Sequence, residues 1–104
     1  MAPKTLADRK AVVRLELERR ARVGQTVTYG EMARKVGLVP AGLGKILNII
    51  KAEEAGRKRP DLGCLVVNVR TGFPGYVGPE PANQQRALAL REAVFAAWRE
   101  PPAE

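Results

Sequence analysis

Apolar residues recur at helical spacing in three long segments of the chain. These segments are residues 6–22, 40–55 and 83–99, and each has the repeat of an amphipathic helix with one apolar stripe. The three stripes consist of Leu6, Val13 and Leu17, of Leu43, Ile46, Leu47, Ile49 and Ile50, and of Leu90, Ala93, Val94, Ala97 and Trp98. We expect a helix in each segment.

A fourth, shorter helix is predicted over residues 29–36 from its start signal. Thr28 and Glu31 have the T-x-x-E spacing of a capping box, in which each side chain bonds a backbone N–H of the other residue. Val27 and Met32 stand at the two positions that form a hydrophobic staple across such a start. The sequence therefore predicts a firmly initiated helix here.

The helices over residues 29–36 and 40–55 are separated by very few residues. Gly37 stands where the first helix should end, residues 38–39 form the connection, and Pro40 suits the first position of the next helix. Two helices joined in this way are typical of a helix-turn-helix.

Two other segments have the composition of β structure. Residues 62–70 are β-branched in the centre and nearly continuous in apolarity, so we expect a strand that is buried on both faces or covered by a helix. Residues 26–27 favour a very short strand, and the glycine-rich residues 73–78 favour a loop or a short return strand that resembles a wing. The order of elements predicts a mostly α fold with a small β wing, the winged helix-turn-helix (α-β-α-α-β-wing-α). In such folds the second helix of the pair enters the major groove of DNA.

Length and composition favour one cytoplasmic domain over residues 1–104, with disordered tails at 1–4 and 100–104. No apolar run reaches the roughly 18 residues of a membrane span, and the first residues lack the apolar core of a signal peptide. The chain has a single cysteine, so it cannot form an internal disulfide. It has no histidine, which argues against a zinc site built from Cys and His and excludes acid–base catalysis by histidine. We expect no metal, no cofactor and no membrane partner.

Positive charge is concentrated in the first part of the chain. Residues 1–60 carry 14 Lys and Arg against 6 Asp and Glu, residues 61–104 carry 4 against 5, and the net charge is +7. Pairs such as Glu16 with Arg20 absorb part of this charge within the first helix. The remainder is typical of a nucleic-acid-binding protein, and a solvated basic surface is the alternative.

Small and basic residues of the helix pair are the candidate contacts to double-stranded DNA. A glycine costs a helix about 1 kcal/mol relative to alanine. The helix predicted over residues 40–55 begins with small residues, Ala41, Gly42 and Gly44. Their presence implies that another helix or a DNA backbone approaches the protein backbone closely there. Tyr29 has little core to reach, so we expect it to touch DNA. The candidate phosphate contacts are Arg34, Lys35, Lys45, Lys51, Arg57, Lys58 and Arg59.

Three short stretches resemble a known family. Thr28-Tyr29-Gly30-Glu31-Met32-Ala33, Val66-Val67-Asn68 and Gly75-Tyr76-Val77-Gly78 are similar, in order, to segments of the C-terminal domain of O6-alkylguanine-DNA alkyltransferases and of alkyltransferase-like proteins. The resemblance spans about residues 24–78. The run Leu65-Val66-Val67-Asn68 with Thr71-Gly72-Phe73-Pro74-Gly75 is also similar to uncharacterised small bacterial and phage proteins, which bring no function with them.

The resemblance implies binding of the DNA-repair type, in which a nucleotide is rotated out of the duplex. It implies that Tyr29 meets a phosphate, that the small residues 41–44 lie in the minor groove, and that Tyr76 walls the base pocket. Phe73 and Tyr76 are both able to stack on an extruded base, and burial in the core is the alternative for each. The arginine that fills the vacated base position in the family has no counterpart, and Lys45 is the nearest basic residue.

The reactive centre of the family is not retained. The family carries P-C-H-R-V, whereas residues 62–67 are Leu-Gly-Cys-Leu-Val-Val, with no histidine and no arginine directly after Cys64. A cysteine in apolar surroundings has a raised pKa and is inert. We therefore expect Cys64 to be a core residue and the protein to be no enzyme.

Three hypotheses follow from these patterns. We favour a non-enzymatic DNA-binding winged-helix protein that recognises damaged or flipped bases. A winged-helix interaction module or transcriptional regulator is the second hypothesis, and an atypical DNA alkyltransferase that uses Cys64 is the third. A steep salt dependence of duplex binding distinguishes the first from an interaction module, because phosphate contacts release counterions.

Overall fold

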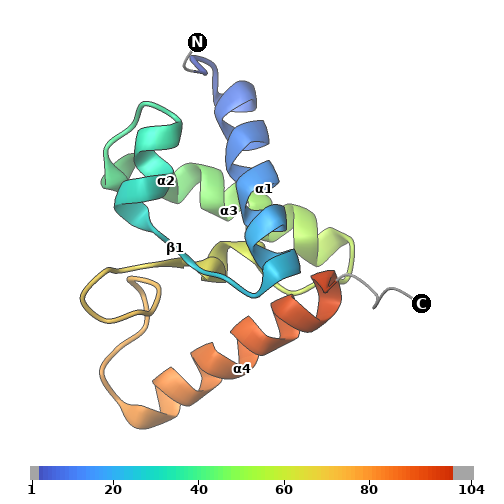
Figure 1. Cartoon of the computed structure of the whole chain (residues 1–104), viewed down its shortest axis with the longest axis vertical. Helices are drawn as coiled ribbons and strands as arrows, with labels where there is room; N and C mark the ends of the chain where they lie inside the picture. Colours follow the sequence, from blue (N-terminus) through green and yellow to red (C-terminus); the bar gives the residue numbers. More distant parts are fainter. Residues whose placement is uncertain (1–2, 100–104) are drawn as a thin grey trace.

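The computed structural model describes residues 3–99, which form four α-helices, two 3-10 turns and two very short strands. In chain order these are α1 (Leu6–Val23), β1 (Val27–Thr28), α2 (Tyr29–Lys35), η1 (Pro40–Leu43), α3 (Gly44–Gly56), η2 (Leu62–Leu65), β2 (Val66–Val67) and α4 (Pro81–Trp98) (Figure 1). The chain is mostly helical with a small β element, as predicted. No helix in the described range is long and apolar enough to cross a membrane.

The predicted tails fall mainly outside the described range. Residues 1–2 and 100–104 lie outside it, whereas Pro3 and Lys4 are described and precede α1 without regular structure. α1 begins directly after Thr5, whose hydroxyl accepts the N–H of Asp8 at 3.0 Å.

The ends of the helices follow local signals in the sequence. The hydroxyl of Thr28 accepts the N–H of Glu31 at 3.2 Å and donates to the Glu31 carboxylate at 3.1 Å, which confirms the predicted start of α2. Gly24 and Gly37 have φ values of 71° and 67° and follow the ends of α1 and α2. Beyond α3 the same left-handed conformation falls on Lys58, with a φ of 57°.

The second helix of the pair begins differently from the prediction. The sequence predicts one helix over residues 40–55, whereas its first four residues form the 3-10 turn η1 and the α-helix begins at Gly44. The N–H of Gly42 donates to the carbonyl of Val39 at 2.9 Å, which is the spacing of a 3-10 turn. Glycines stabilise the α-helix poorly, so two of them favour this alternative.

The predicted strand over residues 62–70 is wrong for most of its length, because η2 occupies its start and only β2 is extended. The side chain of Asp61 accepts the N–H of Gly63 at 2.8 Å, and its carbonyl accepts the N–H of Cys64 at 3.3 Å. These bonds close a local turn in place of an extended start. The predicted burial is confirmed for residues 62–67, which are all buried, and is wrong for residues 68–70, which are exposed.

β1 and β2 pair in parallel, with Val27 opposite Val66. The segment after β2, residues 68–80, contains no strand and is called the 68–80 loop below. It is closed by a hydrogen bond of 2.8 Å from the N–H of Asn68 to the carbonyl of Phe73. The loop alternative for the glycine-rich segment is therefore confirmed. In Figure 1 this loop projects to one side of the helices and leads into α4.

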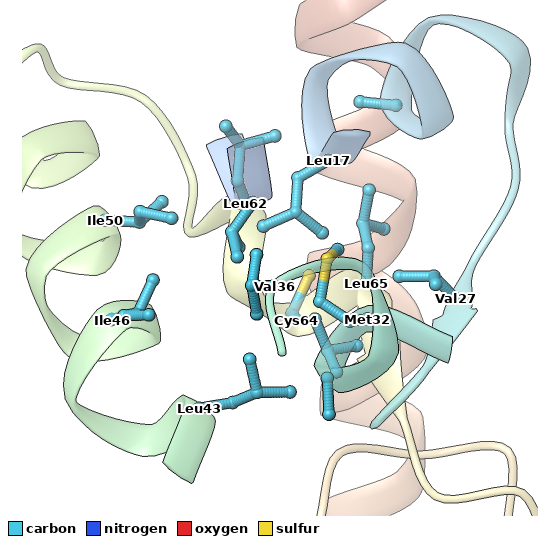
Figure 2. Close-up of a cluster of buried hydrophobic side chains, with 14 of the residues drawn as sticks. Leu17, Val27, Met32, Val36, Leu43, Ile46, Ile50, Leu62, Cys64 and Leu65 are labelled. Atoms are coloured by element: carbon cyan, nitrogen blue, oxygen red, sulfur yellow. The ribbon is translucent and has the colours of Figure 1, made fainter. Parts of the chain in front are cut away.

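One cluster of apolar side chains fills the space between α1, α2, α3 and η2. Figure 2 shows these side chains pointing toward one another from the four elements, with Val27 of β1 at the edge. The labelled members are Leu17, Val27, Met32, Val36, Leu43, Ile46, Ile50, Leu62, Cys64 and Leu65. Both residues of the predicted staple, Val27 and Met32, belong to this cluster.

α4 packs on the rest of the molecule through only part of its predicted stripe. Val94 is buried, and Leu90 and Trp98 pack against the core, whereas Ala93 and Ala97 are exposed. In Figure 1, α4 lies across the molecule below α1 and ends near the last turn of α1.

Candidate functional site

Two tyrosines stand between three adjoining hollows, which together form what we call the tyrosine face. The central hollow, of about 200 Å³, is lined by both Tyr29 and Tyr76. Tyr76 also lines a hollow of about 270 Å³ that reaches Cys64 and α4, here called the Cys64 hollow. Tyr29 also lines a more open hollow of about 480 Å³ beside Val69.

Tyr29 is the first residue of α2, where the capping box at Thr28 places it. Its ring packs partly against the core, and its hydroxyl accepts the N–H of Gly75 at 2.9 Å. The expectation that Tyr29 has little core to reach is therefore wrong, because the residue ties α2 to the 68–80 loop. It still lines two of the hollows, so part of its surface is open to a ligand.

The 68–80 loop presents its two aromatic residues differently. Tyr76 is 70% exposed and lies between the central hollow and the Cys64 hollow. Phe73 is half-buried, with its ring centre 5.6 Å from the guanidinium of Arg91. The same guanidinium donates to the carbonyl of Gly72 at 2.6 Å. Tyr76 is thus available for stacking, whereas Phe73 helps to hold the loop against α4.

The small residues at the start of the second paired helix are exposed. Ala41, Gly42 and Gly44 lie on the surface, with exposed Lys45 beside them. A Cβ atom at Gly44 would meet nothing within 4 Å, and one at Gly42 would make an ordinary contact with Leu38. Close contact with another helix of the described chain, one of the two alternatives for these glycines, is therefore wrong.

Four of the seven candidate phosphate contacts are exposed and make no ion pair within residues 3–99. Lys51 lines the central hollow, and Lys45 follows Gly44 directly. The four residues are Arg34, Lys45, Lys51 and Lys58. The first three belong to α2 and α3, close in sequence to the residues of the tyrosine face.

The basic loop after α3 is engaged with an acidic residue. Arg57 and Arg59 lie 3.4 Å and 3.0 Å from the carboxylate of Glu54, which is 0% exposed and also lies 2.8 Å from Arg14 of α1. The structure thus gives both arginines an acidic partner within the chain.

Glu16 collects basic side chains from α1 and α2. Its carboxylate lies 2.5 Å from Arg19, 2.8 Å from Arg20 and 3.4 Å from Lys35. Burial alone would raise the pKa of Glu16, but the hydrogen bonds from the two arginines and the charge of Lys35 outweigh it and hold the pKa at about 2. The predicted pairing of Glu16 with Arg20 is confirmed, and Lys35 has a partner within the chain.

Asp61 is a site residue that the sequence patterns did not single out. Its half-buried carboxylate lines the central hollow, and its Oδ1 accepts the N–H of Gly63. Burial raises the pKa of Asp61, and the Gly63 N–H and the charge of Lys51 oppose that effect. The D-x-G spacing of an Asx turn was the available signal, but it does not show that the carboxylate meets the tyrosines.

Cys64 is 3% exposed at the edge of the Cys64 hollow. Burial, followed by the negative charge of Asp61, raises the pKa of the thiol to about 12. Such a thiol is almost entirely protonated at neutral pH and lacks the nucleophilic thiolate form. The prediction that Cys64 is a core residue is confirmed.

The part of the chain that the structure describes holds no group of three or more His, Cys, Asp or Glu that could bind a metal ion. Comparison of the chain with family models, with curated proteins and with solved structures finds no match. The tyrosine face offers a ligand two phenol rings, a carboxylate and the ammonium group of Lys51.

Proposed function

We propose that this protein binds double-stranded DNA as a winged helix-turn-helix, without catalysing a reaction, and recognises bases that are damaged or flipped out of the duplex. The observation that carries the proposal is the tyrosine face, where Tyr29 and Tyr76 flank a hollow beside an open, glycine-containing helix start. α2 and the segment of η1 and α3 act as the helix pair, and the 68–80 loop takes the place of the wing.

The start of the second helix makes the close approach to the duplex. Ala41, Gly42 and Gly44 are exposed and carry no side chain larger than a methyl group, so a DNA backbone can come near the protein backbone. Lys45 and Lys51 bring positive charge to the same helix. Contacts of this kind position a protein on DNA and supply affinity rather than sequence recognition.

The two tyrosines supply the surface for an extruded base. Stacking of a base on an aromatic side chain is worth about 1–3 kcal/mol and tolerates any base. Extrusion costs least for a mismatched or damaged base, so a stacking hollow favours altered sites. The resemblance to alkyltransferase-like proteins supports this proposal, because Tyr29 and Tyr76 stand in the matching segments.

The state of Cys64 supports binding without alkyl transfer. The Cys64 hollow adjoins the central hollow, and a base that reached it would meet a thiol whose raised pKa keeps it protonated. The chain has no histidine to accept the thiol proton. Nucleophilic attack needs the thiolate, so the protein holds an altered base rather than repairing it.

The salt dependence of duplex binding tests the proposal. The affinity for a short labelled duplex is measured by fluorescence anisotropy between about 50 and 200 mM salt. Replacing both Lys45 and Lys51 by alanine should reduce the slope of log affinity on log salt by about 2, one for each lost phosphate contact. The matched control replaces Lys4 and Arg99 by alanine, which changes the net charge equally.

The control pair should leave the slope almost unchanged. Both of its residues are exposed and distant in sequence from the tyrosine face. If both double variants reduced the slope of log affinity on log salt equally, the tyrosine face would not be part of the DNA interface. Absence of salt-dependent duplex binding would overturn the proposal and favour an interaction module.

A further inference from the structure

The central hollow has an acidic group among its lining residues. Asp61 is half-buried there, between the tyrosines and Lys51 of α3. Its Oδ1 accepts the N–H of Gly63 at 2.8 Å, whereas its Oδ2 makes no hydrogen bond within the described residues. A carboxylate is an acceptor only, so the Oδ2, which is not shut off from solvent, is available to an N–H or O–H donor of a ligand.

We propose that Asp61 selects the base in the central hollow by accepting N–H donors from its Watson–Crick edge, so that the site takes guanine in preference to O6-alkylguanine. This inference rests on the proposed function and names the ligand of that site. It also departs from the expectation that the family resemblance brings, because an alkylated guanine becomes the poorer ligand.

The preference follows from the donors that each base offers. Guanine presents two adjacent donors, the N1–H and the N2 amino group, which match the two oxygens of a carboxylate. Alkylation at O6 removes the N1 hydrogen and turns N1 into an acceptor, which then faces the negative charge of Asp61. A site built to bond a hydrogen rejects an analogue without it strongly, because its own polar group is left unpaired.

The rest of the hollow is compatible with a single nucleotide. Its volume of about 200 Å³ lies below the range of drug-sized pockets, so it suits one flat base rather than a larger ligand. Tyr29 and Tyr76 are available to contact the ring faces, and Lys51 is available to the phosphate. Asp61 is the acceptor that distinguishes one base edge from another.

The test compares duplexes that differ in one base opposite an abasic site, so that extrusion costs little in every case. The bases are guanine, inosine, which lacks the N2 amino group, and O6-methylguanine, which lacks the N1 hydrogen. A fully paired duplex is titrated in parallel with the same protein. We expect guanine to be bound about tenfold more tightly than either analogue, as a lost charged hydrogen bond implies.

Asp61→Asn removes the charge but keeps an oxygen that can accept the N–H of Gly63, so the turn before η2 is retained. In this variant the preference for guanine, measured as the ratio of its affinity to that of each analogue, should fall to about twofold or less. The ratio is taken within one protein, so a change in overall duplex affinity from the lost charge cancels. Glu92→Gln, at an exposed position of α4, is the matched control and should keep the tenfold preference.

Equal affinity of the wild type for guanine and O6-methylguanine would overturn the selection by Asp61. The same conclusion would follow if Asp61→Asn kept the full preference. If the wild type still binds the paired duplex, either of these two results rules out base selection by Asp61 but not the proposed DNA binding. Loss of wild-type binding to the paired duplex would overturn both proposals together.

Discussion

The hydroxyl of Tyr29 accepts the backbone N–H of Gly75 at 2.9 Å, across 46 positions of the sequence. Tyr29 opens α2, and Gly75 lies in the 68–80 loop beside Tyr76. The bond thus joins the first helix of the pair to the loop that carries the second tyrosine. A single side chain both contributes to the tyrosine face and holds its other wall in place.

Removal of this bond should loosen the 68–80 loop. Tyr29→Phe keeps the ring but loses the acceptor, so the free energy of unfolding should fall by about 1 kcal/mol. Amide hydrogen exchange at Gly75 should become faster in the variant. Tyr29→Ala should cost more, because it also removes ring packing. Unchanged stability together with unchanged exchange at Gly75 would show that the bond does not form in solution.

Substitution of Lys58 should reveal backbone strain after α3. Its φ of 57° lies in the left-handed region, which glycine adopts without the steric cost that a Cβ atom brings. Lys58→Gly should therefore be about 1 kcal/mol more stable than Lys58→Ala, which removes the same charge. Urea unfolding of the two variants measures the difference. Equal midpoints would mean that the left-handed conformation is not maintained.

The thiol of Cys64 should react slowly in the folded protein. With a pKa of about 12, its thiolate fraction at pH 8 is about a thousandfold or more below that of an ordinary cysteine. A chromogenic disulfide reagent should modify the native protein at least about a hundredfold more slowly than the urea-unfolded chain. Comparable rates in the two states would contradict the burial of this residue.

Acid should destabilise the protein through Glu16. Its pKa of about 2 in the folded protein lies below the value of 4.5 for a free glutamate, so the unfolded chain takes up the proton first. The stability that Glu16 contributes is present above about pH 4.5 and is lost as the pH falls toward 2. Denaturant unfolding at several pH values should show this loss in the wild type.

The variant Glu16→Gln isolates this effect from that of the other carboxylates. It should be less stable than the wild type at pH 7, because Arg19, Arg20 and Lys35 lose their shared charged partner. The difference between the two proteins should shrink at low pH. A difference that stays constant from pH 7 to 3 would show that the pKa of Glu16 is not lowered.

Several features of this protein could be predicted from the sequence because their causes are local. Thr28 and Glu31 are three residues apart, and their hydrogen bonds start α2 regardless of what surrounds it. Gly37 supplies the positive φ that follows this helix. The long helices were likewise predicted from the helical spacing of their apolar residues. This spacing arises because one face of each helix packs against the core. Tyr76 was also identified as an aromatic residue of the candidate site.

The tertiary structure decided the features that depend on distant partners. An apolar run without alternation fits a buried strand and a buried turn equally, and pairing with the distant β1 made only Val66 and Val67 a strand. Glu54 is close in sequence to Arg57 and Arg59, but only the packing of α3 beside α1 buries its carboxylate and adds Arg14 as a partner. The meeting of Asp61 with both tyrosines was decided in the same way, because side chains from three segments share one hollow only after the core has formed.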